Sequence, residues 1–132
     1  MSGHTPLNPA GLPAPISHYS NGVKVGDMIY VSGQVALDGE GRLVGPGDVV
    51  AQTRQALENV RSVLAAGGAT LDDVVKVTVF LANVDDRPRV NEVRKSYFGA
   101  NRPASTLVEV SRLAFPGLLV EIEAVAVASR RP

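Results

Sequence analysis

The segment from Leu118 to Val127 limits the possible folds more than any other part of the chain. Every second residue in it is apolar, and the residues between them include two glutamates. Successive side chains of a strand point to opposite faces, so this alternation predicts a β-strand. One face of that strand is apolar and consists of Leu118, Val120, Ile122, Ala124 and Ala126. The other face carries two carboxylates among apolar side chains: Leu119, Glu121, Glu123, Val125 and Val127. Two carboxylates on one face raise each other's pKa where water is excluded, so we look for chemistry there.

The composition excludes several classes of function. The chain has 132 residues and is predicted to form a single domain, 1–132. Its 13 basic and 13 acidic residues cancel, so the overall charge favours neither nucleic acid nor an anionic membrane as a partner. There is no cysteine, and His4 and His18 are too few for a histidine metal cluster, so we expect no metal and no cofactor. The sequence lacks a long apolar run and the apolar centre of a signal peptide, so we expect a cytoplasmic protein.

The N-terminal part of the chain predicts an arm followed by a hairpin. Four prolines in residues 1–15 predict an extended arm with no helix or ladder of its own. Two apolar runs follow, 16–25 and 28–32, and Gly26-Asp27 between them suits a two-residue hairpin turn. Asn21-Gly22 is a competing turn, so the register of this hairpin stays open.

Two helices are predicted in the middle of the chain. Asp48 can cap the first, Gly67-Gly68 ends it, and its buried stripe consists of Val49, Thr53, Ala56, Leu57, Val60, Val63 and Leu64. The second begins at Asp85 or Asp86 before Pro88 and ends at Gly99. One face of this second helix is shared by Val90, Val93, Arg94, Tyr97 and Phe98.

Strands are predicted over 74–81 and 105–110, and a Pro116-Gly117 turn leads to the final strand. The resulting order is strand, strand, helix, strand, helix, strand, strand, which can form one mixed sheet with both helices on a single face, an α+β fold. The opposite face would combine apolar with polar side chains: Lys76, Thr78, Phe80, Leu119, Glu121, Glu123, Val125 and Val127. Such a face is too apolar to leave in water, so we predict a homo-oligomer with ligand clefts between its subunits.

Several segments together match a known family. They are Asp27–Gln34, Gln52–Leu64, Val75–Leu81, Val90-Asn91 with Tyr97-Phe98, and Arg102-Pro103-Ala104 leading through Val108–Val110 to Val120–Ala126. From about Ser17 to its end, the chain resembles the RidA/YjgF family of reactive-intermediate deaminases, also labelled L-PSP endoribonucleases. The resemblance implies a chorismate-mutase-like fold and a homotrimer with a cleft at each subunit interface.

The resemblance also implies an activity and a set of site residues. It implies hydrolysis of enamines and imines, of the 2-aminoacrylate and 2-iminopropanoate type, to a keto compound and ammonia. In that family an arginine after Pro-Ala binds the substrate carboxylate, and a glutamate on the last strand orients or activates water. Carried over by position, the glutamate is Glu123, and the role of Glu121 stays open. The implied substrate-binding residues are Tyr19, Ser32, Gly33, Asn91, Ser105, Thr106 and Leu107.

Ser105 stands where the family has its arginine, because the chain reads Pro-Ala-Ser-Thr. Without this arginine, the two charge-assisted hydrogen bonds to the substrate carboxylate are lost. We therefore expect an α-imino acid to bind at least about tenfold to a hundredfold more weakly than it would with the arginine present. Arg102 and Arg112 are candidates to replace the missing group. One alternative is therefore a non-catalytic, small-molecule-binding or chaperone-like trimer. The other is an endoribonuclease, which zero net charge and few aromatic residues do not favour.

Overall fold

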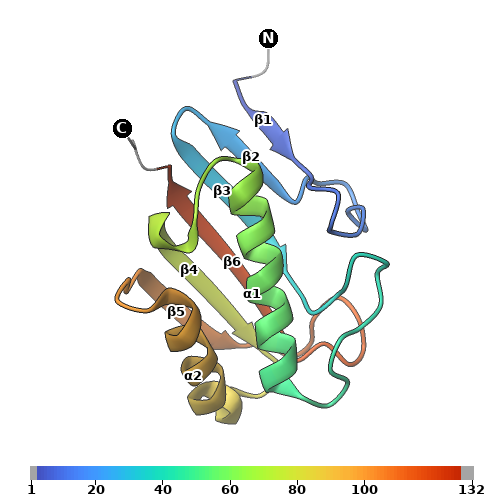
Figure 1. Cartoon of the computed structure of the whole chain (residues 1–132). Helices are drawn as coiled ribbons and strands as arrows, with labels where there is room; N and C mark the ends of the chain where they lie inside the picture. The colour runs from blue at the N-terminus through green and yellow to red at the C-terminus, as the bar shows by residue number, and fades with distance from the viewer. Residues whose placement is uncertain (1–2, 129–132) are drawn as a thin grey trace.

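The computed structural model describes residues 3–128, which form one six-stranded sheet with two helices on the same face (Figure 1). The strands are β1 (Thr5–Leu7), β2 (Gly22–Val25), β3 (Met28–Gln34), β4 (Val74–Leu81), β5 (Ala104–Glu109) and β6 (Val120–Val127). Their order across the sheet is β1-β2-β3-β6-β4-β5. Only β4 and β5 run parallel, and the other neighbouring strands are antiparallel. The predicted α+β architecture with a mixed sheet is confirmed.

The strand β6 lies inside the sheet, between β3 and β4, and α1 (Val49–Ala66) packs across it (Figure 1). Its helix-facing residues are all buried: Val120, Ile122, Ala124 and Ala126. The alternation therefore predicted the correct faces, although the strand begins two residues after Leu118, beyond the Pro116-Gly117 turn. This arrangement places Glu121 and Glu123 on the face of the sheet that the helices leave uncovered.

The first helix begins and ends where the sequence predicts. The Asp48 side chain accepts a hydrogen bond from the Ala51 N–H at 3.1 Å, and Gly67 forms the C-cap. All seven residues of the predicted stripe are buried. Helix formation here follows from an apolar face with the period of an α-helix and from a carboxylate that satisfies a free N–H at the start.

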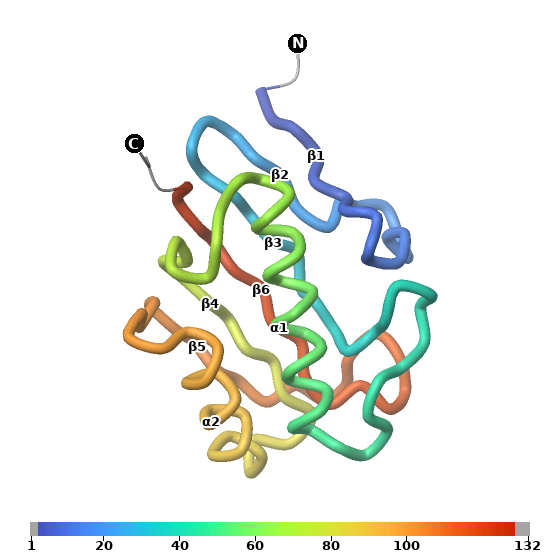
Figure 2. Tube along the Cα trace, in the orientation of Figure 1, coloured from blue at the N-terminus to red at the C-terminus, as the bar shows by residue number. Residues whose placement is uncertain are grey.

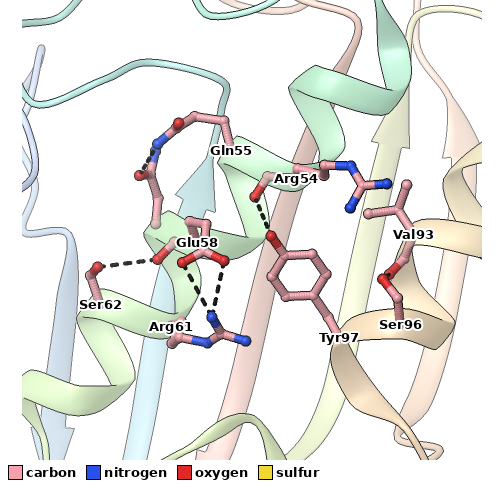
Figure 3. A network of polar contacts seen from close by, with 9 residues as sticks. Arg54, Gln55, Glu58, Arg61, Ser62, Val93, Ser96 and Tyr97 are labelled. Atoms are coloured by element: carbon pink, nitrogen blue, oxygen red, sulfur yellow. Dashed lines mark hydrogen bonds and ion pairs between the residues drawn. The ribbon is translucent and has the colours of Figure 1, made fainter.

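The second helix, α2 (Arg87–Phe98), is fixed against α1 by Tyr97 (Figure 3). The Tyr97 hydroxyl donates to the Arg54 carbonyl at 3.4 Å, and the Arg61 guanidinium lies 5.1 Å from the centre of the Tyr97 ring. Gly99 ends α2, as predicted, and its φ is 59°. Two short 3-10 helices, η1 (Leu71–Asp73) and η2 (Val84–Asp86), precede β4 and α2. These contacts fix the orientation of the α2 residues that border β5.

The N-terminal segment differs from its prediction. The expectation that it forms no ladder is wrong at Thr5–Leu7, because β1 pairs antiparallel with β2 and places Pro6 opposite Val23. Proline is tolerated there because β1 is an edge strand, where a missing N–H leaves no partner unpaired. Burial of the Leu7 side chain in the core accounts for the docking of this strand. The Gly26-Asp27 turn between β2 and β3 is confirmed.

The face of the sheet opposite the helices, here called the open face, carries large apolar side chains. Tyr30, Val108 and Val127 are 46%, 39% and 40% exposed, and they lie near Glu121, Glu123 and Lys76. No helix of residues 3–128 covers this face. None of the helices in this part of the chain is both long and apolar enough to cross a lipid bilayer.

Gln52 connects α1 to two loops that lie side by side in the Cα trace, 35–47 and 110–119 (Figure 2). Its side chain is fully buried, and its Nε2 donates to the Gly45 carbonyl at 3.1 Å and to the Gly117 carbonyl at 3.0 Å. Its Oε1 accepts from the Leu119 N–H at 2.8 Å. One amide therefore satisfies three backbone groups and sets the path of the chain into β6.

We predict that Gln52→Leu lowers the free energy of unfolding by about 3 kcal/mol, because three partly buried backbone groups lose their partner. Urea unfolding followed by circular dichroism measures the change. Gln55→Leu on the same helix is the control, because it removes one hydrogen bond, to Asn59, and should cost about 1 kcal/mol or less. Equal losses in the two variants would contradict the role assigned to Gln52.

Candidate functional site

A β-bulge at Ser32-Gly33 shapes one part of the candidate site. Val31 lies opposite Ala124 and Gln34 lies opposite Ile122, so β3 contains one extra residue relative to β6. The Ser32 hydroxyl donates to the Ser20 carbonyl at 2.6 Å, and the Gln34 Nε2 donates to the Ser32 carbonyl at 3.1 Å. The bulge is therefore held by hydrogen bonds on both sides.

The Glu121 carboxylate lies directly against the backbone of Gly33. A Cβ atom placed on Gly33 would lie 2.1 Å from Glu121 Oε2, so glycine is required for the carboxylate to occupy this position. The two residues border a hollow of about 320 Å³. Its lining consists of Ile16, Ser17, Tyr19, Ser32, Gly33, Val35, Ala114, Phe115 and Glu121. Three predicted site residues, Tyr19, Ser32 and Gly33, thus meet Glu121 in one place, here called the carboxylate hollow.

The environment of Glu121 favours its protonated form. Burial raises the pKa of the Glu121 carboxyl above its ordinary value of 4.5, and the charge of Glu123 raises it further. Within residues 3–128, burial and the charge of Glu123 are the causes of this pKa shift, and no hydrogen bond opposes it by favouring the ionised form. Its proton affinity is therefore higher than that of an exposed carboxylate, which suits a group that accepts and returns a proton.

Glu123, the glutamate that the resemblance selected, lies one pleat further along the open face. It is exposed, stands opposite Thr78 of β4, and does not border the carboxylate hollow. Alternation alone could not separate the two glutamates, because residues two apart in a strand share a face. The contact between Glu121 and Gly33 comes from the bulge, which is a tertiary feature.

A second group of predicted residues gathers at the β5 edge of the sheet. The Arg94 guanidinium on α2 donates to the Ser105 hydroxyl at 2.7 Å and to the Asn91 side-chain oxygen at 3.3 Å. Sequence reasoning placed Arg94 on the inner face of its helix but assigned it no role in the site. An arginine among apolar side chains, three residues after Asn91, was the available signal.

The other two predicted site residues of β5, Thr106 and Leu107, lie on opposite faces of the sheet. Thr106 accepts a hydrogen bond from Lys76 Nζ at 2.9 Å on the open face. Leu107 packs against the core on the helix side. Among residues 3–128, no group of three or more histidine and acidic side chains is arranged to hold a metal ion.

The two groups of site residues are far apart within one chain. Ser32-Gly33 belongs to β3 and Ser105 to β5, and β6 and β4 lie between them. Three strand-to-strand spacings amount to about 14 Å. The structure therefore brings Tyr19, Ser32 and Gly33 to one place and Asn91 and Ser105 to another, but it does not join the two places.

Comparison with known proteins identifies the family. The family model described as Endoribonuclease L-PSP matches residues 1–128. The chain belongs to this family. A RutC family protein of Pyrococcus abyssi is 46% identical over 114 residues, which cover 86% of this chain and 89% of the relative. The 2-iminobutanoate/2-iminopropanoate deaminase of the mouse is 45% identical over 115 residues, or 87% of this chain and 84% of the relative.

Solved structures of relatives share the whole fold. The YjgF gene product of E. coli superposes with a TM-score of 0.87 at 38% identity and covers 95% of this chain and 99% of its own. The crystal structure of E. coli TdcF with bound serine superposes with a TM-score of 0.88 at 35% identity. This match covers 95% of the present chain and 99% of TdcF. The membership of the RidA/YjgF group that the motifs indicated is confirmed, and so is its fold.

We predict that Glu121→Gln raises the melting temperature at neutral pH. The pKa of Glu121 is higher in the folded than in the unfolded chain, so its contribution to stability decreases as the pH rises from the ordinary carboxyl pKa through the raised value. The stability gain of the variant should therefore vanish at pH values below 4.5. Differential scanning calorimetry across pH measures it, with Glu92→Gln in an exposed ion pair as control. A melting temperature lowered by Glu121→Gln at neutral pH would contradict this interpretation.

Proposed function

We propose that this protein is a hydrolytic deaminase, which converts small imines, and enamines through their imine tautomers, to a keto compound and ammonia. The observation that carries the proposal is the half-buried Glu121 carboxylate against the Gly33 backbone, in a hollow shared with Tyr19 and Ser32. The 45% identity to the mouse deaminase over 87% of the chain supports the same class of reaction.

The proposed role of Glu121 is to move a proton between water and the substrate nitrogen. As the water oxygen attacks the imine carbon, Glu121 accepts a proton from that water and passes it to the imine nitrogen, which gives a neutral carbinolamine and restores the carboxylate. Glu121 then accepts the proton of the carbinolamine hydroxyl and passes it to the amino nitrogen. The carbon–nitrogen bond breaks as the carbonyl forms, ammonia leaves, and Glu121 is again a carboxylate. A carboxyl whose pKa is raised by burial and by Glu123 is better suited to both transfers than an ordinary carboxylate.

We further propose that the working cleft lies between subunits of a homotrimer. In one chain, Ser32-Gly33 on β3 and Ser105 on β5 are separated by three strand spacings, at least about 14 Å, which is too far for one small acid to contact both. The apolar open face supports burial by further copies. A second copy that brings its β5 edge to the hollow would complete the site. The serine in TdcF supports a small ligand with a carboxylate.

We predict that Glu121→Gln lowers the rate of imine hydrolysis by about a hundredfold or more, the usual contribution of a positioned acid–base group. Formation of keto acid from 2-aminoacrylate, which a dehydratase generates from serine, measures the rate. Glu123→Gln should retain most activity and shift the acidic limb of the pH profile to lower pH, because it removes the charge that raises the pKa of Glu121. The exposed variant Glu92→Gln is the control.

Other outcomes of this assay would favour other functions. If Glu123→Gln loses more imine-hydrolysis activity than Glu121→Gln, Glu123 is the residue that activates water, as the resemblance implies. No acceleration by the wild type would favour a non-catalytic ligand-binding trimer. RNA cleavage that survives repurification and disappears in Glu121→Gln would favour the endoribonuclease.

We predict that light scattering gives a particle mass of three times 13.8 kDa. Tyr30→Glu should shift this mass toward that of the monomer, because it places a charge on the apolar open face. A monomeric wild type would contradict the proposed cleft.

A further inference from the structure

Arg94 is a cation whose contacts are all with neutral groups. Its guanidinium donates to Ser105 Oγ at 2.7 Å and to Asn91 Oδ1 at 3.3 Å, and it forms no ion pair with any carboxylate of residues 3–128. The side chain is half-buried, and burial lowers the pKa of the guanidinium. A partly desolvated charge without a counter-charge is unfavourable, so an anionic ligand at this place would be stabilised. The two contacts use two of the five guanidinium donors and leave the others for a ligand.

The space beside Arg94 is large enough for a small acid and electropositive. A cavity of about 500 Å³ is lined by Asn91, Arg94, Phe98, Asn101, Arg102 and Pro103, together with Lys95 and Gly99. No acidic side chain belongs to this lining within the described chain. Lys95 is already paired with Glu92 at 3.0 Å, and Arg102 is exposed. Arg94 therefore provides the positive charge that is both partly buried and held in a fixed orientation.

The small side chain of Ser105 is what allows this position. Arg94 reaches from α2 to the hydroxyl of Ser105, on the neighbouring strand β5. A long cationic side chain at position 105 would meet the Arg94 guanidinium and repel it. Ser105 and Arg94 therefore act as a pair, in which the serine leaves space and accepts one hydrogen bond.

We propose that Arg94, held by Ser105 and Asn91, binds the carboxylate of the substrate and so replaces, from helix α2, the arginine that position 105 lacks. This inference rests on the proposed function, because an α-imino acid carries a carboxylate next to the carbon that water attacks. It assigns the role to Arg94 rather than to Arg102, which is exposed, or to Arg112, which is exposed and does not line the cavity. A planar guanidinium binds a carboxylate through two parallel hydrogen bonds, so the site should select acids over neutral analogues of the same shape.

The test measures binding and turnover in the same set of variants. Calorimetry gives the affinities for pyruvate, the keto acid product, and for pyruvamide, its neutral analogue. The KM and kcat are measured with 2-iminopropanoate formed in place from alanine by an amino acid oxidase. The variants are Arg94→Gln, Arg94→Lys and the double variant Arg94→Gln with Ser105→Arg. Arg89→Gln is the matched control, because Arg89 lies on the same helix about 140° around its axis from Arg94.

Arg94→Gln should weaken pyruvate binding and raise KM by about tenfold to a hundredfold, with kcat changed less and pyruvamide binding unchanged. Arg94→Lys should have a pyruvate affinity and a KM between those of the wild type and Arg94→Gln, because lysine keeps the positive charge but lacks the planar guanidinium. The double variant should recover pyruvate binding, and Arg89→Gln should match the wild type.

Several results would overturn the inference. They are unchanged pyruvate affinity and KM in Arg94→Gln, an equal loss for pyruvamide, or no pyruvate binding by the wild type. If the wild type binds pyruvate but does not hydrolyse the imine, the proposed function fails. The pyruvate affinities of the variants then still decide the role of Arg94.

Discussion

The side chains of β6 alternate between two faces of the sheet, and this alternation determines both where the core forms and where the two glutamates lie. Its small apolar side chains fill the space beneath α1, so the strand has to lie inside the sheet. The same alternation fixes Glu121 and Glu123 on the opposite face, which no helix of residues 3–128 covers. The core residues and the two glutamates thus lie on opposite faces of one strand, and a slip of one residue would exchange the two faces.

Most of the fold could be predicted from local patterns, because each pattern has a direct physical cause. Asp48 caps α1, Gly99 ends α2, and Gly26-Asp27 turns the hairpin, all as the sequence predicts. The strand β1 was missed, because four prolines outweighed the one buried leucine that docks it. The secondary-structure propensity of a segment depends on its own residues, whereas its docking depends on which apolar surface of the domain its side chains can pack against.

The candidate site was harder to predict, because it depends on contacts between distant segments. The residues Tyr19, Ser32 and Gly33 follow from the resemblance, and the structure does group them. The choice between Glu121 and Glu123 depends on a bulge in β3, and the contact of Arg94 with Ser105 depends on how α2 packs beside β5. The chain therefore holds the Glu121 carboxylate on β6 and the Arg94 guanidinium on α2 at separate places, which we propose to be the two halves of one site.

A crystal structure of the protein grown with pyruvate shows whether the Arg94 cavity and the carboxylate hollow meet between subunits. We expect pyruvate between two subunits, with its carboxylate on Arg94 of one chain and its keto carbon beside Glu121 of the next. A monomer in the crystal, or pyruvate bound elsewhere while Arg94 contacts only Ser105 and Asn91, would show that the two places do not form one site.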